Sequence, residues 1–358
     1  MSNKSITRNS NLELLRIFSM LMIIASHYVL HGGALEIPFS INGNIAHFIN
    51  VGGKVGVIIF VLLSGYFLVD SKFRIKKILA VIFEVLFYTI IIFVLSYLTG
   101  YQGFSLLSML KSFLPVLFST YWFVPAYLGM FILAPFSNIL INHLSKKQFS
   151  VFLVVMFIMF SAITIIPSIN PFAVSDMTYF IFIYFLAAYL KKHWARKIPA
   201  SIYLAVFASS WILVYLTYPI FNYLSTYFSS FSEGLTYYAS LKSPFTLLTA
   251  TSAFLFFKQI KVKDSKAINL IASTTFGIFL LHDNFIARTF IWQNIFHTSD
   301  YFYSTFFFLH LLATVCAIFI IGCGIDLFRK FTIGLLVETC IAKKKFENID
   351  NKINSILT

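Results

Sequence analysis

Two polar side chains lie in the first long apolar stretch of the chain. Arg16 and His27 are 11 positions apart, which corresponds to about 1,100° of rotation in an α-helix and returns to within about 20° of the same direction. We therefore expect both side chains on one helix face, about 16 Å apart along the axis. Glu13 precedes Arg16 by three positions, a spacing at which an acid and a base can pair on a helix.

These residue types can bind an anion and move a proton. The imidazole of His27 can act as a general base or as a nucleophile, and its ordinary pKa near 6.5 suits both halves of such a reaction. Each residue also has a simpler structural explanation, Arg16 as an anchor at the membrane surface and His27 as an interhelical hydrogen bond. A charged side chain at the centre of a membrane helix costs about 2.5–3.5 kcal/mol. Because Arg16 and His27 also share one helix face, we favour a functional role for the pair.

The composition identifies the elements that must position these residues. The chain has 358 residues, of which 59% are hydrophobic and 11% are charged, whereas soluble domains carry about 25% charged residues. So few charges cannot cover a water-exposed surface, which excludes a soluble enzyme, a secreted domain and a disordered scaffold. The sequence predicts an all-α, polytopic membrane helix bundle.

A helix that crosses about 30 Å of hydrocarbon needs about 20 apolar residues. Ten stretches of the sequence are candidates, of which the sixth is short. The fourth contains two prolines, Pro125 and Pro135, that can kink or break it. The expected spans are 12–30, 51–69, 76–98, 121–141, 149–167, 177–190, 200–218, 241–257, 268–287 and 303–328.

Basic residues alternate between the connecting segments. Of the 27 lysines and arginines, 22 lie at the N-terminus, in the tail, or in the loops after the second, fourth, sixth and eighth spans. Because cytoplasmic loops are enriched in such residues, the pattern predicts that both termini are cytoplasmic and that the protein is a multi-pass protein of the cell (plasma or inner) membrane. We expect one integral-membrane domain, 1–340, followed by a cytoplasmic tail, 341–358. The five remaining cations are Arg16, Lys54, Lys111, Lys242 and Arg288.

Two classes of partner are not expected. The net charge of +14 is explained by the cytoplasmic loops, so we predict no nucleic-acid partner beside the membrane lipids. The cysteines Cys316, Cys323 and Cys340 have no spacing typical of a metal site, and we predict no metal cofactor.

Several segments together resemble the membrane acyltransferase-3 family. Residues 11–16 (NLELLR), followed ten positions later by Ser26 and His27, resemble its Arg-x10-His signature. The chain departs from the family at Ile58, where many members carry Asp, and at Lys77, which replaces a second Arg. Lysine lacks the bidentate fork of arginine, so the second change affects how phosphate would be held there. The other similar segments are 52–66 (GGKVGVIIFVLLSGY), 74–77 (RIKK), 121–125 (YWFVP) and 276–282 (FGIFLLH).

The resemblance implies a fold of ten spans, an activity and a site. Members transfer acyl groups, often acetyl, onto cell-envelope polysaccharides and related acceptors, so the expected donor is acyl-CoA, in particular acetyl-CoA. The expected acceptor is a hydroxyl of a polysaccharide or of its lipid-linked precursor. The implied catalytic residues are His27, Arg16 and Glu13. The implied donor-binding residues are Arg74, Lys76, Lys77, Ser64 and Tyr66, and the implied acceptor-binding residues are Trp122, Tyr121 and His282.

Other interpretations of these residues stay open at this point. Ser64 and Tyr66 flank Gly65 and can serve close helix packing, and Trp122 can be an ordinary interfacial tryptophan. A transporter or flippase of envelope lipid or polysaccharide intermediates could use Arg16, His27 and Glu84 as a relay, although we find no internal repeat typical of transporters. A polysaccharide polymerase or ligase is a third possibility, against which the sparsely charged outer loops argue.

Overall fold

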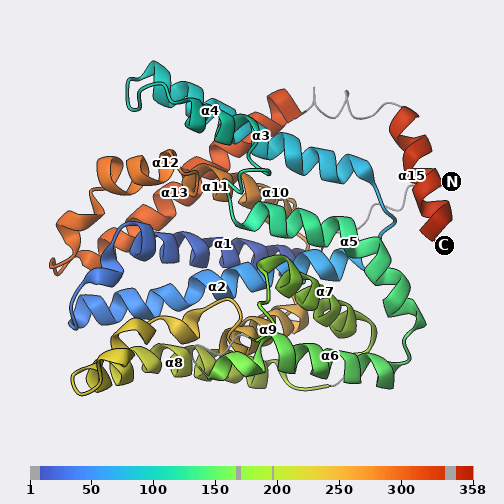
Figure 1. Cartoon of the computed structure of the whole chain (residues 1–358), viewed down its shortest axis with the longest axis horizontal. Helices are drawn as coiled ribbons and strands as arrows, with labels where there is room; N and C mark the ends of the chain where they lie inside the picture. The colour runs from blue at the N-terminus through green and yellow to red at the C-terminus, as the bar shows by residue number, and fades with distance from the viewer. Residues whose placement is uncertain (1–8, 167–170, 196, 335–343, 358) are drawn as a thin grey trace.

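The chain folds into helices joined by short turns. The computed structural model describes residues 9–166, 171–195, 197–334 and 344–357, and this part contains no β-strand (Figure 1). The predicted all-α class is therefore confirmed. The helices are α1 (Ser10–His31), α2 (Ile41–Leu68), α3 (Ile75–Leu98), α4 (Leu106–Phe113), α5 (Phe123–His143), α6 (Lys146–Phe160), α7 (Asp176–Lys192), α8 (Ala200–Ser225), α9 (Pro244–Gln259), α10 (Lys266–Ser273), α11 (Thr275–His282), α12 (Ala287–Thr289), α13 (Phe307–Arg329) and α15 (Lys344–Leu357).

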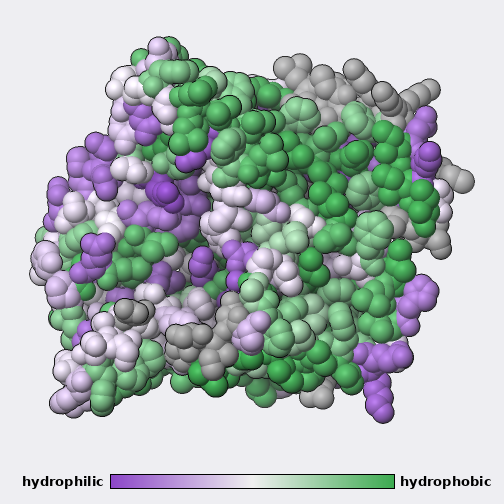
Figure 2. All heavy atoms as spheres, viewed as in Figure 1, coloured by the Kyte–Doolittle hydropathy of each residue, from purple (hydrophilic) through white to green (hydrophobic). Residues whose placement is uncertain are grey.

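Seven helical segments of the described chain are long and apolar enough to cross a membrane. They are α1, α2, α3, α5, α8, the segment Lys146–Ile165 that extends α6, and the segment Phe307–Gly334 that extends α13. The broken pair Lys266–His282 and Ala287–Ile295, bent by 93°, makes eight if it counts as one span. Hydrophobic side chains cover much of the viewed surface of α3, α5 and α6 (Figure 2). The protein is therefore a multi-pass membrane protein.

Two of the predicted spans form shorter helices. The stretches 177–190 and 241–257 correspond to α7 and α9, which have 17 and 16 residues. At 1.5 Å per residue these helices are about 26 and 24 Å long, less than the roughly 30 Å of the hydrocarbon layer.

The centre of the bundle is the pair α1 and α2, which run antiparallel between α3 and α13 on one side and α7 to α9 on the other (Figure 1). In the apolar window of α2, 78% of the residues are buried, against 17% in α8. Helix α2 is thus enclosed by protein, whereas α8 leaves most of its apolar surface for lipid. The first long apolar stretch, with Arg16 and His27, therefore lies in the interior.

Glycines allow α1 and α2 to lie this close. A Cβ atom on Gly53 would stand 2.2 Å from the Oγ atom of Ser26, and one on Gly56 would stand 2.7 Å from the backbone oxygen of Ser19. Any side chain at these positions would push the two helices apart beside His27. The glycine-rich start of the segment 52–66 thus has a packing role.

Some helices begin or end at other residues than the apolar stretches predicted. Pro135 lies inside α5 without ending it. The predicted span 268–287 is divided at Thr274 and turns sharply after His282. The outer segment 99–120 contains the short helix α4, which the expected spans did not include.

The described part of the tail is helical and bound to the bundle. The side chain of Asp350 in α15 accepts a hydrogen bond from the backbone N–H of Ile75 (2.8 Å), and Asn354 exchanges two hydrogen bonds with the backbone of Phe73. Helix α15 therefore covers the loop between α2 and α3.

Candidate active site

One face of α1 carries a row of residues that leads from Arg16 to a histidine pair. Met20, Ile23, His27 and His31 follow Arg16 at steps of three or four positions, so all five share that face. Arg16 pairs with Glu13 through an Nε–Oε2 distance of 3.1 Å, as the spacing predicted. The side chains of His27 and His31 are 13% and 19% exposed, so neither is fully enclosed by protein.

His27 forms a hydrogen bond with a histidine that is 255 positions away in the sequence. Its Nδ1 atom lies 3.0 Å from Nε2 of His282, a residue with no exposed surface. The other nitrogen of His282, Nδ1, lies 2.6 Å from the carbonyl oxygen of Ile278. Because a carbonyl oxygen only accepts, His282 Nδ1 carries the proton, and in the neutral ring Nε2 is then an acceptor. His27 Nδ1 consequently donates, and His27 Nε2 keeps a free lone pair.

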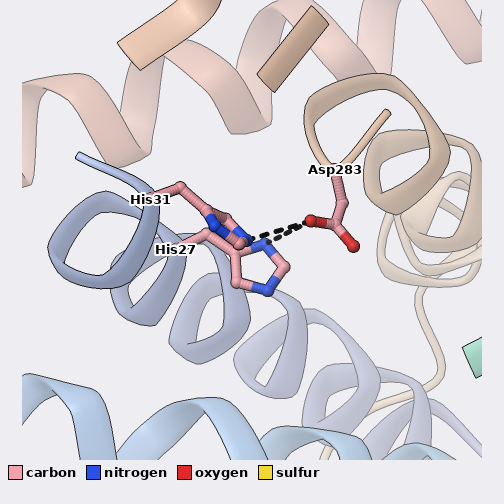
Figure 3. Close-up of side chains that lie close together, drawn as sticks. All are labelled: His27, His31 and Asp283. Atoms are coloured by element: carbon pink, nitrogen blue, oxygen red, sulfur yellow. Dashed lines mark ion pairs between the residues drawn. The ribbon is translucent and has the colours of Figure 1, made fainter. Parts of the chain in front are cut away.

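A buried carboxylate lies beside the two histidines of α1. Asp283 Oδ1 is 3.1 Å from His31 Nε2 and 3.8 Å from His27 Nδ1, and the aspartate is 6% exposed. Figure 3 shows both imidazoles reaching from α1 toward Asp283, with the second ring nitrogen of His27 turned away from the carboxylate. The carboxylate thus stabilises a positive charge on either ring while His27 Nε2 stays available.

The turn after α11 places Asp283. The side-chain oxygen of Asn284 accepts a hydrogen bond from the backbone N–H of Ile286 at 2.9 Å, a local bond typical of Asn in turns. Tyr121, 1% exposed, accepts a hydrogen bond from the Asn284 side chain and donates one to the carbonyl of Leu280. Tyr121 therefore holds the end of α11, and its hydroxyl is turned into the protein rather than toward an acceptor.

The same three side chains could also hold a metal ion. The nearest ligand atoms of His27, His31 and Asp283 all lie within 4.8 Å of one another, and imidazole with carboxylate is a donor set that suits zinc. Two contacts favour proton transfer instead. His27 Nδ1 already faces His282, and the guanidinium of Arg288 lies 4.0 Å from the Asp283 oxygen that would bind the metal.

A small apolar cavity lies along the row between Arg16 and His27. It has a volume of about 20 Å³ and is lined by Met20, Ile23, Val57, Phe60, Phe123, Phe276 and Phe279. Phe279 connects this cavity to the site, because its ring centroid is 6.5 Å from that of His27.

The other predicted residues are distributed over the two ends of the bundle. Arg74 and Lys77 are exposed at the start of α3, and Lys76 Nζ lies 3.3 Å from Glu347 of α15. Within the described residues, no hydrogen bond or ion pair joins them to Arg16 or His27. The structure therefore does not bring the predicted donor-binding and catalytic residues into direct contact.

Ser64 and Tyr66 lie at the end of α2, against α7 and α9. Tyr127 donates a hydrogen bond to Ser64 (3.3 Å). The ammonium groups of Lys191 and Lys258 lie 5.1 and 5.3 Å from the Tyr66 ring centroid. Tyr66 thus belongs to a second cationic group at the Arg74 end of the bundle.

Trp122 lies at the opposite end, near His27. Its ring receives the ammonium of Lys54 at 4.3 Å from the centroid, and the residue is only partly buried. Of the three predicted acceptor-binding residues, Trp122 alone has an exposed part, since Tyr121 and His282 are buried.

A separate ionic network connects α3 to α13. Arg329 Nη2 lies 2.8 Å from Glu84, and Arg329 Nε lies 2.7 Å from Asp326, a residue with no exposed surface. Tyr88 donates a hydrogen bond to Asp326 at 2.9 Å. Glu84, which a transporter relay with Arg16 and His27 could have used, is paired with Arg329 instead. An open cavity of about 580 Å³ adjoins this network.

Sequence reasoning missed His31 and gave Asp283 no catalytic role. His31 follows His27 by four positions, a spacing that puts both on one helix face, so this signal was present in the sequence. No local pattern indicates that Asp283 approaches α1, because the contact depends on how α1 and α11 pack.

The comparisons with known proteins give one match. An acyltransferase domain family model matches residues 9–325, nearly the whole chain. No curated protein and no solved structure matches the chain.

Proposed function

The chain belongs to the acyltransferase family that this domain model describes, and from that premise we propose that it moves an acetyl group from acetyl-CoA to a hydroxyl of a cell-surface polysaccharide or of its lipid-linked precursor. The observation that carries the proposal is the hydrogen-bonded chain from His27 Nδ1 through His282 to the carbonyl oxygen of Ile278, from which we infer that His27 Nε2 is the unprotonated nitrogen. A transporter or flippase is not favoured, because the family match is to an acyltransferase.

The proposed reaction uses His27 as the base. Nε2 removes the proton of the acceptor hydroxyl as its oxygen attacks the thioester carbonyl. The tetrahedral intermediate then expels the CoA thiolate, which takes the proton back from the imidazolium. The Asp283 carboxylate, 3.8 Å from His27 Nδ1, stabilises the transient positive charge. If His27 instead carries the acyl group, the same Nε2 atom attacks the thioester and expels the CoA thiolate. The acceptor hydroxyl then attacks the acyl-imidazole, its proton passes to the thiolate, and the neutral imidazole is released.

This function is tested by reconstitution of the full chain in lipid vesicles. Acetyl-CoA labelled in the acetyl group is supplied with an oligosaccharide acceptor, and the product is identified by mass spectrometry. We expect an ester-linked gain of one acetyl mass per acceptor. Surface glycans from cells with and without the protein provide the second measurement. The proposal fails if neither measurement shows an acyl group whose presence depends on the protein.

We propose that the donor enters at the end of the bundle that carries Arg74 and Lys77. Both are exposed cations, and the phosphates of CoA are anionic, which suits them to charge-assisted hydrogen bonds. Replacing both with Gln is expected to raise the KM for acetyl-CoA at least about tenfold, since each hydrogen bond to a charged group contributes about 1.5–3 kcal/mol, while kcat changes little.

Steady-state kinetics in vesicles measure this effect. The exposed Lys147, at the start of α6, is the matched control, and Lys147→Gln is expected to leave the KM unchanged. An unaltered donor KM in the double variant would remove Arg74 and Lys77 from the donor site.

The apolar cavity supports acetyl as the transferred group. A volume of about 20 Å³ is close to the roughly 10–15 Å³ that a single water needs, so it accepts a methyl group but not a longer chain. Ile23→Ala is expected to raise kcat/KM for butyryl-CoA relative to acetyl-CoA about tenfold, since two buried methylene groups correspond to about 1.6 kcal/mol.

Ile24 is the control for this prediction. It is the same residue type, is buried on the same helix and does not line the cavity. Competition between the two acyl-CoAs gives the ratio directly. An equal shift in Ile24→Ala, or no shift in Ile23→Ala, would show that the cavity does not select the acyl group.

We propose ten membrane crossings, with both termini in the cytoplasm of a plasma or inner membrane. Of the 27 lysines and arginines, the 22 in the termini and alternate loops support a cytoplasmic location for those segments. Side-chain contacts also bring several of these segments together at one end of the bundle. The start of α1 hydrogen-bonds to Ser265 through Ser10, Lys191 pairs with Asp70 at 2.8 Å, and Phe73 contacts Asn354. Helices α7 and α9 are the two shorter crossings.

This topology predicts accessibility. After replacement of the native cysteines with serine, single cysteines at positions 191–195 are expected to be shielded from an impermeant thiol reagent in intact cells. A cysteine at Tyr303, an exposed residue at the other end, is expected to react. Labelling of 191–195 from outside would contradict the ten-span arrangement.

A further inference from the structure

Three of the five cations outside the basic loops surround the His27 site. Arg288 Nη1 lies 4.0 Å from Asp283 Oδ1. Lys111 Nζ lies 5.7 Å from the ring centroid of Phe285, two residues after that aspartate. Lys54 is close enough to Asp176, Asp283 and His27 to interact with all three electrostatically. Because lysines and arginines are rare at this end of the bundle, their convergence on one place indicates a common ligand.

Lys54 is the most informative of these cations. It follows Gly53, which packs against Ser26, so its position relative to His27 is fixed by the contact between α1 and α2. Its ammonium lies over Trp122 at 4.3 Å, and it forms no ion pair with a carboxylate of the described residues. An aromatic face compensates only part of the hydration that a cation loses on burial. Lys54 thus retains capacity for an anion.

The carboxylates nearby do not neutralise this group. Asp283 faces His27, His31 and Arg288 together, and Asp176 pairs with Lys242 at 3.2 Å. Lys54 and Lys111 are therefore left without a carboxylate of their own in the part of the chain described. Hydrophilic side chains also gather on the viewed face beside α12 and over α1, between hydrophobic surfaces (Figure 2). A polar surface thus lies on the viewed face beside α12 and over α1.

We propose that the acceptor is an anionic glycan, whose carboxylate or phosphate group is held by Lys54 and Arg288 next to the hydroxyl that receives the acyl group. This rests on the proposed function and names its acceptor class. Trp122 supplies an apolar face for a sugar ring beside the charged contact, as aromatic side chains with a wet edge commonly do. Lys111 adds long-range attraction for the same charge.

The test compares three acceptors that share one oligosaccharide backbone: a neutral one, one with a uronic-acid carboxylate and one with a phosphate ester. The full chain in vesicles is assayed with acetyl-CoA. We expect at least one charged acceptor to have a KM about tenfold or more below that of the neutral one. The charged acceptor with the lower KM shows whether the site prefers a carboxylate or a phosphate.

Variants then assign the effect to its residues. Lys54→Gln is expected to raise the KM for the charged acceptor about tenfold or more and to leave the neutral acceptor and the donor KM unchanged. Lys54→Arg keeps the charge and is expected to retain most of the preference, which shows that the site is folded. Lys242→Gln is the matched control, because Lys242 is a cation at the same end that Asp176 already pairs with.

Two results would overturn the inference. One is equal use of neutral and charged acceptors by the wild-type protein. The other is a Lys54→Gln variant that impairs both acceptors to the same extent, which would assign Lys54 to the reaction or to packing. Both leave acyl transfer itself intact, whereas failure of the proposed function means that no acceptor is acylated at all.

Discussion

Replacement of His27 by alanine is expected to abolish acyl transfer while the protein remains in the membrane at its normal level. Loss of a general base costs about 10²–10⁴-fold in rate, and His27 Nε2 is the atom whose lone pair the His282 hydrogen bond leaves free. His27 is 13% exposed on its side chain, so its removal opens a limited space at the site. Initial rates in vesicles, normalised to the amount of protein, measure the loss.

A second variant separates chemistry from packing. His27→Gln keeps a side chain that can donate and accept hydrogen bonds but cannot move a proton near neutral pH, so it is expected to be as inactive as the alanine variant. His310, which is bonded to Tyr28 and stacked on Tyr301, is a histidine of α13 outside the site. His310→Gln is expected to retain transfer. High activity in His27→Gln would show that His27 only joins helices.

Replacement of Arg329 by glutamine is expected to destabilise the folded bundle strongly. Arg329 faces Glu84 and Asp326 together, at 2.8 and 2.7 Å. Its loss leaves Glu84 without an ion pair and leaves Asp326 with Lys330 alone, at 3.2 Å. Removing one partner of a buried ion pair typically costs about 3–5 kcal/mol. The expected result is a lower midpoint of thermal unfolding in detergent and less protein in the membrane.

A second substitution is expected to restore part of the stability that Arg329→Gln loses. Adding Glu84→Gln to Arg329→Gln removes the carboxylate that is left without a partner and is expected to recover part of the thermal stability, since a neutral pair costs less than an unpaired buried charge. The exposed Lys147→Gln serves as a control for loss of a cation alone. An Arg329→Gln variant as stable as wild type would mean that the network does not hold α3 to α13.

The all-α class could be predicted from the sequence because a long apolar segment satisfies its backbone hydrogen bonds inside a membrane by forming a helix. The shared face of Arg16, His27 and the intervening Met20 and Ile23 likewise follows from helix geometry alone. The partners of these residues do not, because periodicity along one helix carries no information about which helix packs against it. His282 and Asp283 could be singled out as polar residues, but their contact with His27 requires the packing of α11 on α1.

The tail shows a second limit of sequence reasoning. Residues 346–354 are rich in Asn and charged side chains, and we expected a cytoplasmic tail without a packing role. Asp350 and Asn354 lie four positions apart, so they share a helix face, and both bind backbone groups of the loop before α3. The same contact explains Lys76, which was expected at the donor and pairs with Glu347. Nothing in the basic loop itself identifies that partner.

The separation of His27 from its partners by 255 positions has a consequence for how the enzyme is made. A chain that is being synthesised inserts α1 long before α11 leaves the ribosome, and until then His27 has neither the hydrogen bond that fixes its tautomer nor the carboxylate that stabilises its charge. With His27 as the proposed base, nascent and prematurely terminated chains are expected to occupy the membrane without transferring acyl groups. Catalytic competence is then expected late in biogenesis, when the segment that carries His282 and Asp283 packs against the first helix.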